Sequence, residues 1–162
     1  MTAVHGNSTD LGEGNTLVPV FRAAHEIWIR ETDSFLAPVV VPGAPFWDRW
    51  TAVRYMADQF LGQYQRELSL VNELRPFLPA QTGESLTRDG ERIGELLGEL
   101  DRVGRRRGTA HTVAVFARRL LDSLRLWCAD IEAAAWRVPR DVLPEEGARL
   151  AADLERYISG PR

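Results

Sequence analysis

The sequence predicts an all-α protein, an up-down four-helix bundle with a short C-terminal fifth helix. Two observations support this prediction. Apolar residues recur every three to four positions over long stretches, as they do along the buried side of an amphipathic helix. Prolines and glycines separate these stretches, and none of them shows the alternation of a β-strand. Four long amphipathic helices joined mostly by short connections are the ingredients of such a bundle.

The first helix is predicted over residues 16–36, with Asn15 as its N-cap. Its apolar residues are Leu17, Phe21, Ala24, Trp28 and Phe35. The segment APVVVPGAP that follows is predicted to be an extended loop, because prolines flank its valines. Residues 1–15 lack the basic start and apolar core of a signal peptide. They are predicted to form a flexible tail before a bundle over residues 16–162.

The second helix is predicted to begin at Pro45, a favoured first-turn residue, and to end near Arg75, before Pro76. Its apolar stripe is Trp50, Val53, Ala57, Phe60, Tyr64, Leu68 and Val71. A fourth helix is predicted over residues 109–138. Its apolar stripe is Phe116, Leu120, Leu124, Trp127, Ile131 and Ala134. Pro144 starts the short fifth helix.

The third helix is predicted over residues 85–107 and contains the stretch DGERIGELLGEL. Its apolar residues at helical spacing are Ile93, Leu96, Leu97 and Leu100. Gly90, Gly94 and Gly98 recur at every fourth position and therefore share one face of the helix. Each glycine inside a helix costs about 0.5–1 kcal/mol relative to alanine. We therefore expect this face to leave room beside the helix.

Composition and charge exclude several classes of protein. The chain has 44% hydrophobic and 27% charged residues and a net charge of −3, so no basic field attracts nucleic acid or an anionic membrane. No apolar run approaches the roughly 20 residues of a membrane helix. The single cysteine, Cys128, excludes an internal disulfide and fits a cytoplasmic protein. All basic residues are arginine, which indicates a bacterial genome rich in GC.

Two of the predicted helices share a template in which a leading residue is followed three positions later by an apolar one. The leading residue is His25 in the first helix and Gly90 in the third. This template resembles the hemerythrin-like, or HHE cation-binding, family, whose first and third helices carry histidine at the leading position. NELRPFLPA at residues 72–80 resembles the end of the family's second helix. WCADIEAAAWRVPRDVLPEEGARL at residues 127–150 resembles its fourth helix and the tail that follows.

The resemblance implies a bundle built around a di-iron site, which needs about five histidines and two carboxylates from four helices. His25 stands at the first-helix ligand position. In the second helix the ligand positions fall on Leu68 and Asn72, or in the alternative register on Ser69 and Glu73. In the third helix they fall on Gly90 and Gly94. In the fourth helix the histidine position falls on Trp127, and Asp130 or Glu132 stands near the acidic position. One histidine and one acid cannot hold two irons, so we expect a degenerate, metal-free member. The alternative is a residual iron site that senses oxygen or nitric oxide.

The resulting hypothesis is a bundle that binds a small organic molecule in the vacated core. If the protein is an enzyme, which the sequence leaves open, His25 is the expected general acid or base. Glu31 and Glu67 are expected near the core, in the same pocket. The expected aromatic walls are Trp28, Tyr64 and Trp127. In the alternative interpretation His25 is a partly buried structural residue, and both carboxylates reach the surface or pair with Arg54.

The competing hypothesis is an interaction or scaffold protein. Phe46 and Trp47, at the start of the second helix, form an apolar pair suited to a partner or to a homodimer. The arginine run within residues 102–107 is interpreted as a solvated helix end, because no aromatic stacking platform for nucleic acid accompanies it. No Ser-His-Asp signature, phosphate-binding loop or zinc spacing occurs in the sequence.

Overall fold

The computed structural model describes residues 17–41, 43–105 and 110–138, together with Arg149, Ala152 and Arg156. Four α-helices occur in this part of the chain: α1 (Leu17–Val40), α2 (Phe46–Leu74), α3 (Ala80–Arg105) and α4 (Ala110–Ala135). A single 3₁₀ turn, η1 (Arg75–Phe77), separates α2 from α3. No β-strand occurs among the described residues, so the prediction of an all-α protein is confirmed.

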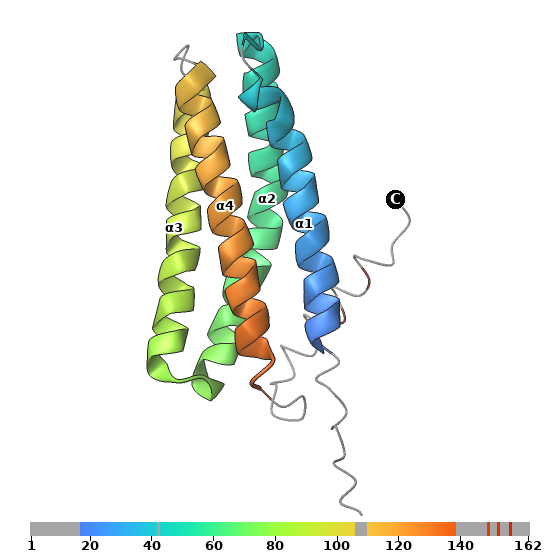
Figure 1. Ribbon diagram of the computed structural model, residues 1–162, viewed down its shortest axis with the longest axis vertical. Helices are drawn as coiled ribbons and strands as arrows, with labels where there is room; N and C mark the ends of the chain where they lie inside the picture. Colours follow the sequence, from blue (N-terminus) through green and yellow to red (C-terminus); the bar gives the residue numbers. More distant parts are fainter. Residues whose placement is uncertain are drawn as a thin grey trace, which may run out of the picture.

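The helices lie side by side and form an all-α bundle (Figure 1). α1 packs against α2 and α4, and α3 packs against the same two helices. Large, fully buried side chains from every helix meet along the centre: Phe21, Phe60, Ile93 and Trp127. These side chains belong to one continuous hydrophobic core.

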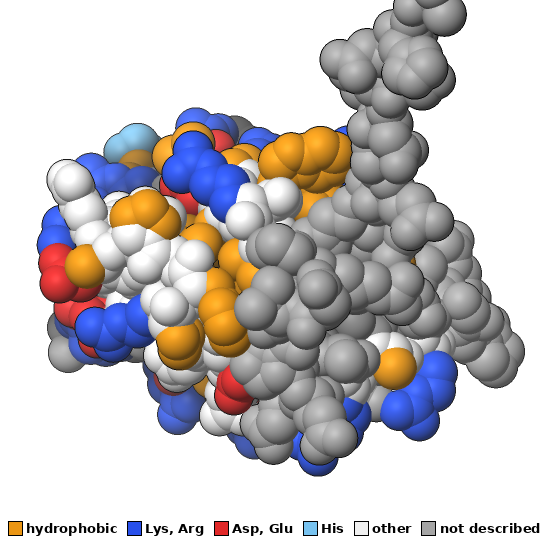
Figure 2. Space-filling model, turned by 90° about the horizontal axis from the view of Figure 1, so that it is seen from below, with side chains coloured by type: hydrophobic (Ala, Val, Ile, Leu, Met, Phe, Trp, Pro, Cys, Tyr) orange, Lys and Arg blue, Asp and Glu red, His pale blue; other side chains and the backbone are white. Residues whose placement is uncertain are grey.

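The described surface is mixed in charge. Seen from below, basic and acidic side chains lie around the edge of the bundle, with apolar side chains between them (Figure 2). None of the helices in the described part of the chain combines the length and the apolar character needed to cross a bilayer.

The first helix is longer than the sequence predicts. The predicted end is Leu36, whereas α1 continues through Pro38 to Val40. Pro38 has no N–H to donate within the helix, which weakens this last turn. Leu36 and Val39 are nevertheless 2% and 0% exposed, and their burial stabilises the turn. The prediction of an extended loop is therefore wrong for residues 37–40.

The other helices agree more closely with the predictions. α2 follows Pro45, which is its N-cap, and α4 begins and ends within three residues of the predicted bounds. α3 begins at Ala80 rather than at residue 85, because the carbonyl of Pro79 accepts hydrogen bonds from the first turn. The predicted tail over residues 1–15 lies outside the described residues. So does the predicted helix from Pro144, except for three isolated positions.

Gly90 and Gly94 on α3 leave space for aromatic side chains from neighbouring helices. A Cβ atom on Gly90 would lie 2.8 Å from Cζ2 of Trp127, and one on Gly94 would lie 2.6 Å from the hydroxyl oxygen of Tyr64. A Cβ atom on Gly98 would meet no atom within 4 Å. Side chains of α4 and α2 therefore occupy the space directly beside Gly90 and Gly94, whereas Gly94 and Gly98 also border an open hollow of about 350 Å³. The expectation of room beside this face is wrong at Gly90 and holds at Gly98.

The same two aromatic residues form hydrogen bonds to the backbone of α3. The indole N–H of Trp127 donates to the carbonyl oxygen of Leu86 at 2.8 Å. The hydroxyl of Tyr64 donates to the carbonyl oxygen of Gly90 at 2.9 Å. The two rings also contact each other, with their centroids 6.0 Å apart. We refer to Tyr64 and Trp127 as the aromatic clamp, because they hold α3 against α2 and α4.

The glycine positions give a test of this packing. Gly90→Ala is expected to lower the free energy of unfolding by about 1–3 kcal/mol, because the added methyl group overlaps the buried ring of Trp127. Gly98→Ala is expected to raise it by about 0.5–1 kcal/mol, since alanine favours the helix and meets nothing there. Urea unfolding followed by far-ultraviolet circular dichroism measures both. Equal stability of the two variants would contradict the close approach of Trp127 to Gly90.

Candidate functional site

Three charged side chains from three helices meet inside the bundle. His25 lies on α1, Glu67 on α2 and Glu132 on α4. Nε2 of His25 lies 3.3 Å from Oε2 of Glu67, and its Nδ1 lies 2.8 Å from Oε1 of Glu132. The side chains of His25 and Glu67 are each 1% exposed, and that of Glu132 is 17% exposed. We refer to these three residues as the His25 cluster.

Two further polar residues extend the His25 cluster in opposite directions. On the inner side, Nε2 of Gln63 donates to Oε1 of Glu67 at 2.7 Å, and Gln63 is buried. On the outer side, Nε of Arg22 donates to Oε2 of Glu132 at 3.1 Å, and Arg22 is exposed. The hydrogen bonds therefore run without a break from a surface arginine to a buried glutamine.

Helical spacing carries Glu67 into the core. The buried stripe of α2 includes Phe60, Gln63, Glu67, Leu70 and Leu74. These residues recur every three or four positions and therefore share one side of the helix. The stripe predicted from the sequence passed through Tyr64 and Leu68, both of which are half-buried. The buried side of α2 is thus centred one residue earlier than predicted.

The geometry of the His25 cluster suits an imidazolium ion. Burial of His25 has the largest single effect and lowers its pKa. The hydrogen bonds and negative charges of Glu67 and Glu132 together outweigh burial, so the pKa lies above its ordinary value of 6.5. Both ring nitrogens face carboxylate oxygens, and only the protonated ring donates from both nitrogens. With His25 protonated, His25 and Arg22 balance the two carboxylates.

Cys128 lies in the same region, but its environment does not favour reactivity. It is 1% exposed. Burial raises the pKa of its thiol, and the negative charges of Glu67 and Glu132 raise it further. Because the thiolate is the form that attacks electrophiles and binds metals, we interpret Cys128 as a packing residue.

The residues present do not fit the iron site that the family resemblance implies. Both nitrogens of His25 face carboxylates, and the ligand positions on α3 are glycines covered by the aromatic clamp. Within residues 17–41, 43–105 and 110–138, no group of three or more His, Cys, Asp or Glu side chains has an arrangement that could hold a metal ion. The described residues therefore do not reproduce the histidine-rich donor set that a di-iron site of this kind needs.

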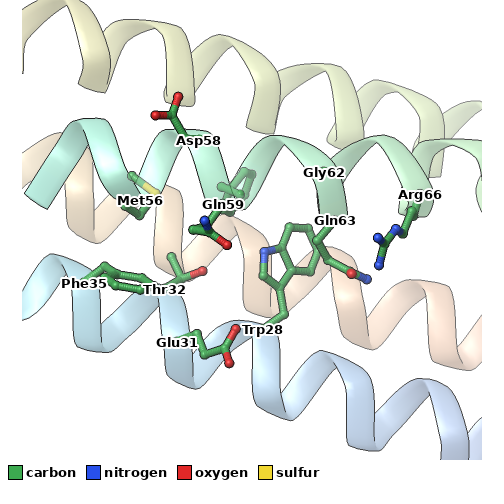
Figure 3. Close-up of a pocket in the computed structure, with 11 residues that line it drawn as sticks. Trp28, Glu31, Thr32, Phe35, Met56, Asp58, Gln59, Gly62, Gln63 and Arg66 are labelled. Atoms are coloured by element: carbon green, nitrogen blue, oxygen red, sulfur yellow. The ribbon is translucent and has the colours of Figure 1, made fainter. Parts of the chain in front are cut away.

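A pocket of about 240 Å³ lies between α1 and α2 (Figure 3). Its buried lining residues are Trp28, Thr32, Met56, Phe60 and Gln63. The exposed residues around it are Glu31, Asp58, Gln59, Gly62 and Arg66, and Phe35 is half-buried. Gln63 connects the pocket with the His25 cluster, since it lines the pocket and also donates a hydrogen bond to Glu67. The pocket is therefore one side chain away from the His25 cluster.

The buried lining of this pocket contains an unsatisfied donor. Trp28 is 4% exposed, and its indole nitrogen has no hydrogen-bond partner among the described residues. A buried donor without a partner costs about 1–3 kcal/mol. A lining residue of the pocket therefore carries an enclosed polar atom without a partner, and a ligand that reached it could supply the hydrogen bond.

The structure separates the predicted site residues into three groups. His25 and Glu67 meet in the His25 cluster. Tyr64 and Trp127 form the aromatic clamp and contact α3. Trp28 and Glu31 line the pocket between α1 and α2. Glu31 is exposed rather than close to the core, and Glu67 does not line the pocket. The prediction that these two carboxylates share one pocket is therefore wrong.

Three polar residues of the site were not predicted to belong together. Arg22 stands three residues before His25, and Gln63 stands four residues before Glu67, so each lies one helical turn from a residue that the sequence singles out. The sequence template places Glu132 only near the acidic iron-ligand position. Helical neighbours of a suspected buried charge are the signal that could have identified the first two.

The free energy of unfolding is expected to fall as the pH rises through the pKa of His25. Because the folded-state pKa lies above 6.5, the native state holds the proton more tightly than the unfolded state does. The stabilisation is complete below about pH 6.5 and is lost above the folded-state pKa. Urea midpoints measured between pH 6 and pH 9 should therefore decline.

The matched control is the double variant His25→Leu/Glu67→Leu. His25→Leu alone would leave a buried carboxylate without its partner, at a cost of about 3–5 kcal/mol, whereas the double variant leaves an apolar pair. We expect the decline to be absent in the double variant and retained in His111→Gln, which changes an exposed histidine. The same decline in the double variant would contradict the assignment to His25.

No family model matches the chain, and neither a curated protein nor a solved structure matches it. The resemblance to the hemerythrin-like family is therefore a proposal that rests on the sequence template around His25 and Gly90 and on the ends of the helices.

Proposed function

We propose that this chain is a degenerate, hemerythrin-like, up-down four-helix bundle that binds a small organic molecule in the pocket between α1 and α2. The observation that carries the proposal is the buried indole N–H of Trp28, which has no partner among the described residues and belongs to the lining of this pocket. The pocket takes the place of the vacated core as the binding site, because the aromatic clamp fills the space beside Gly90 and Gly94.

The size and lining of the pocket suit a single ring with a small substituent. An apolar cavity of about 150 Å³ is known to hold benzene, and this pocket measures about 240 Å³. The rings of Trp28 and Phe60 pack together with their centroids 4.8 Å apart and provide apolar wall. Thr32 and Gln63 add polar groups at the buried side. Apolar walls with a few fixed polar groups are typical of small-molecule sites.

His25 contributes to this site through other residues. It does not line the pocket, because Glu67 and Gln63 lie between them. The ion pair with His25 fixes Glu67, and Glu67 in turn accepts a hydrogen bond from Gln63 in the pocket wall. We therefore propose His25 as a positioning residue of a binding protein. Direct acid–base catalysis would require a ligand atom at the imidazole ring.

A second hollow, of about 350 Å³, lies between α2 and α3 and is less suited to this function. Its charged lining residues are Arg54, Asp58, Asp101 and Arg105. Arg105 already pairs with Asp101 at 2.9 Å, and ion pairs at exposed positions contribute little. The lining of this hollow does not contain the unpartnered indole nitrogen, which belongs to the pocket between α1 and α2.

A neutral ring compound tests the proposed site. We expect p-cresol to bind with a dissociation constant on the order of 0.1–1 mM, because the small number of atoms in the probe limits its affinity. Titration followed by nuclear magnetic resonance should shift amide signals of α1 and α2 around the pocket. Gly62→Leu is expected to weaken binding at least about tenfold, because Gly62 lines the pocket and an added Cβ meets no atom within 4 Å.

The matched control is Gly98→Leu, which adds the same side chain to an exposed helical glycine outside this pocket. It should leave the affinity for p-cresol unchanged. Equal binding by the wild type and both variants would place the probe elsewhere and refute the proposed site.

A second candidate function, homodimer formation, is favoured by the exposed Trp47 at the start of α2 and the two half-buried aromatic side chains beside it. Trp47 is 63% exposed and contacts Phe46 and Trp50, with centroid distances of 5.1 and 6.0 Å. An exposed aromatic cluster of this kind is typical of an interaction surface. A second copy of the chain is the proposed partner, since symmetric pairs are the commonest assembly of soluble proteins.

Sedimentation velocity tests the homodimer. The wild type is expected to sediment as a dimer at tens of micromolar, and Trp47→Ala as a monomer, because the substitution removes the exposed ring at the centre of the contact. Trp136→Ala serves as the control, since Trp136 is also 63% exposed but lies just beyond the end of α4. A monomeric wild type would rule out this candidate function.

A further inference from the structure

We propose that the ligand of the pocket between α1 and α2 is an uncharged single-ring compound with a carbonyl-type acceptor, which accepts a hydrogen bond from the indole N–H of Trp28. This inference rests on the proposed function and adds the chemical class of the ligand. Three features of the pocket support it: the unsatisfied donor, the apolar walls and the distribution of charge.

The unsatisfied donor determines the polar group of the ligand. An indole nitrogen donates and does not accept, so its partner must be an acceptor. The indole nitrogen of Trp28 faces the part of the pocket that Gln59 and Thr32 border (Figure 3). Gln59 is exposed, so its side chain can turn outward and let an acceptor reach the enclosed N–H. The hydrogen bond then removes the penalty of the unpartnered donor.

The apolar lining determines the body of the ligand. Met56 and Phe60 are buried in the lining, and Phe35 is half-buried at its edge. The volume of about 240 Å³ is below the range of about 300–1,000 Å³ that drug-sized ligands occupy. A single ring with one short substituent therefore matches the volume of the pocket.

The uncharged buried lining of the pocket favours an uncharged ligand. The buried lining residues are all uncharged, and Glu67 lies directly behind Gln63. The buried part of the lining supplies no cation to a carboxylate ligand, which would therefore meet a large desolvation cost there. The exposed side chains around the pocket include one cation and two carboxylates, those of Arg66, Glu31 and Asp58. A cationic group cannot itself accept a hydrogen bond from the indole N–H.

Acetophenone and α-methylstyrene form the test pair, because they have nearly the same shape and differ by a carbonyl in place of a methylene group. We expect acetophenone to bind ¹⁵N-labelled wild-type protein about tenfold more tightly, the effect of one satisfied buried donor. The indole N–H resonance of Trp28 should move downfield with acetophenone and not with α-methylstyrene. The chain contains five tryptophans, so this resonance is assigned by side-chain correlation rather than by substitution of a buried residue. Benzoate should bind at least about tenfold more weakly than acetophenone.

The outcomes separate this inference from the proposed function. Equal affinities for acetophenone and α-methylstyrene, both lost in Gly62→Leu, would overturn the ligand class and leave the site standing. Failure of both compounds and of p-cresol to bind would overturn both proposals. Tighter binding of benzoate would show an anion site and refute an uncharged ligand. If the Trp28 resonance does not move and Thr32→Val abolishes the preference for acetophenone, the donor is Thr32 and the assignment to Trp28 is wrong.

Discussion

The buried ion pair between His25 and Glu67 is the interaction on which the rest of the structure depends. A carboxylate that is 1% exposed costs several kcal/mol unless a cation meets it. That cation comes from α1, so α1 and α2 can pack only where their two side chains lie at the same height. Glu132 adds α4 to the same contact through the other ring nitrogen. Apolar stripes tolerate small rotations and shifts of helices, whereas two hydrogen bonds to one imidazole do not. The register of three helices therefore follows from the protonated ring.

The fourth helix is held by a different kind of contact. α3 contributes no residue to the His25 cluster and is joined to α2 and α4 by the aromatic clamp. Gln63 and Tyr64 are adjacent in the sequence and about 100° apart around α2. Gln63 therefore reaches Glu67 and the pocket beside α1, while Tyr64 reaches the backbone of α3. Gly90 and Gly94 on α3 make room for the aromatic clamp, because a side chain at either position would displace the ring of Trp127 or Tyr64.

Local patterns in the sequence identified the helices, the glycine face and His25, because each of these is encoded within one helix. The pairing of His25 with Glu67 and Glu132 could not be read in the same way, since it depends on the relative heights of three helices. The apolar stripe of α2 was misplaced because two buried members, Gln63 and Glu67, are polar and add nothing to a hydrophobic pattern, although Glu67 itself was expected near the core. The end of α1 was misplaced for the opposite reason. Pro38 is a strong local signal, but tertiary burial of Val39 outweighed it.

The position of the pocket at the edge of the bundle follows from how the side chains pack at its centre. In metal-centred bundles, a cation draws ligands from several helices into the middle and needs open space around itself. In this bundle His25 lies between two carboxylates and contacts both directly, and direct contacts between side chains need no such space. The centre can then be packed by the aromatic clamp, and a ligand is accommodated at the edge, between α1 and α2. Gln63 is the residue at which the two regions meet. Any change in the protonation of His25 is therefore expected to reach the pocket through the orientation of the Gln63 amide.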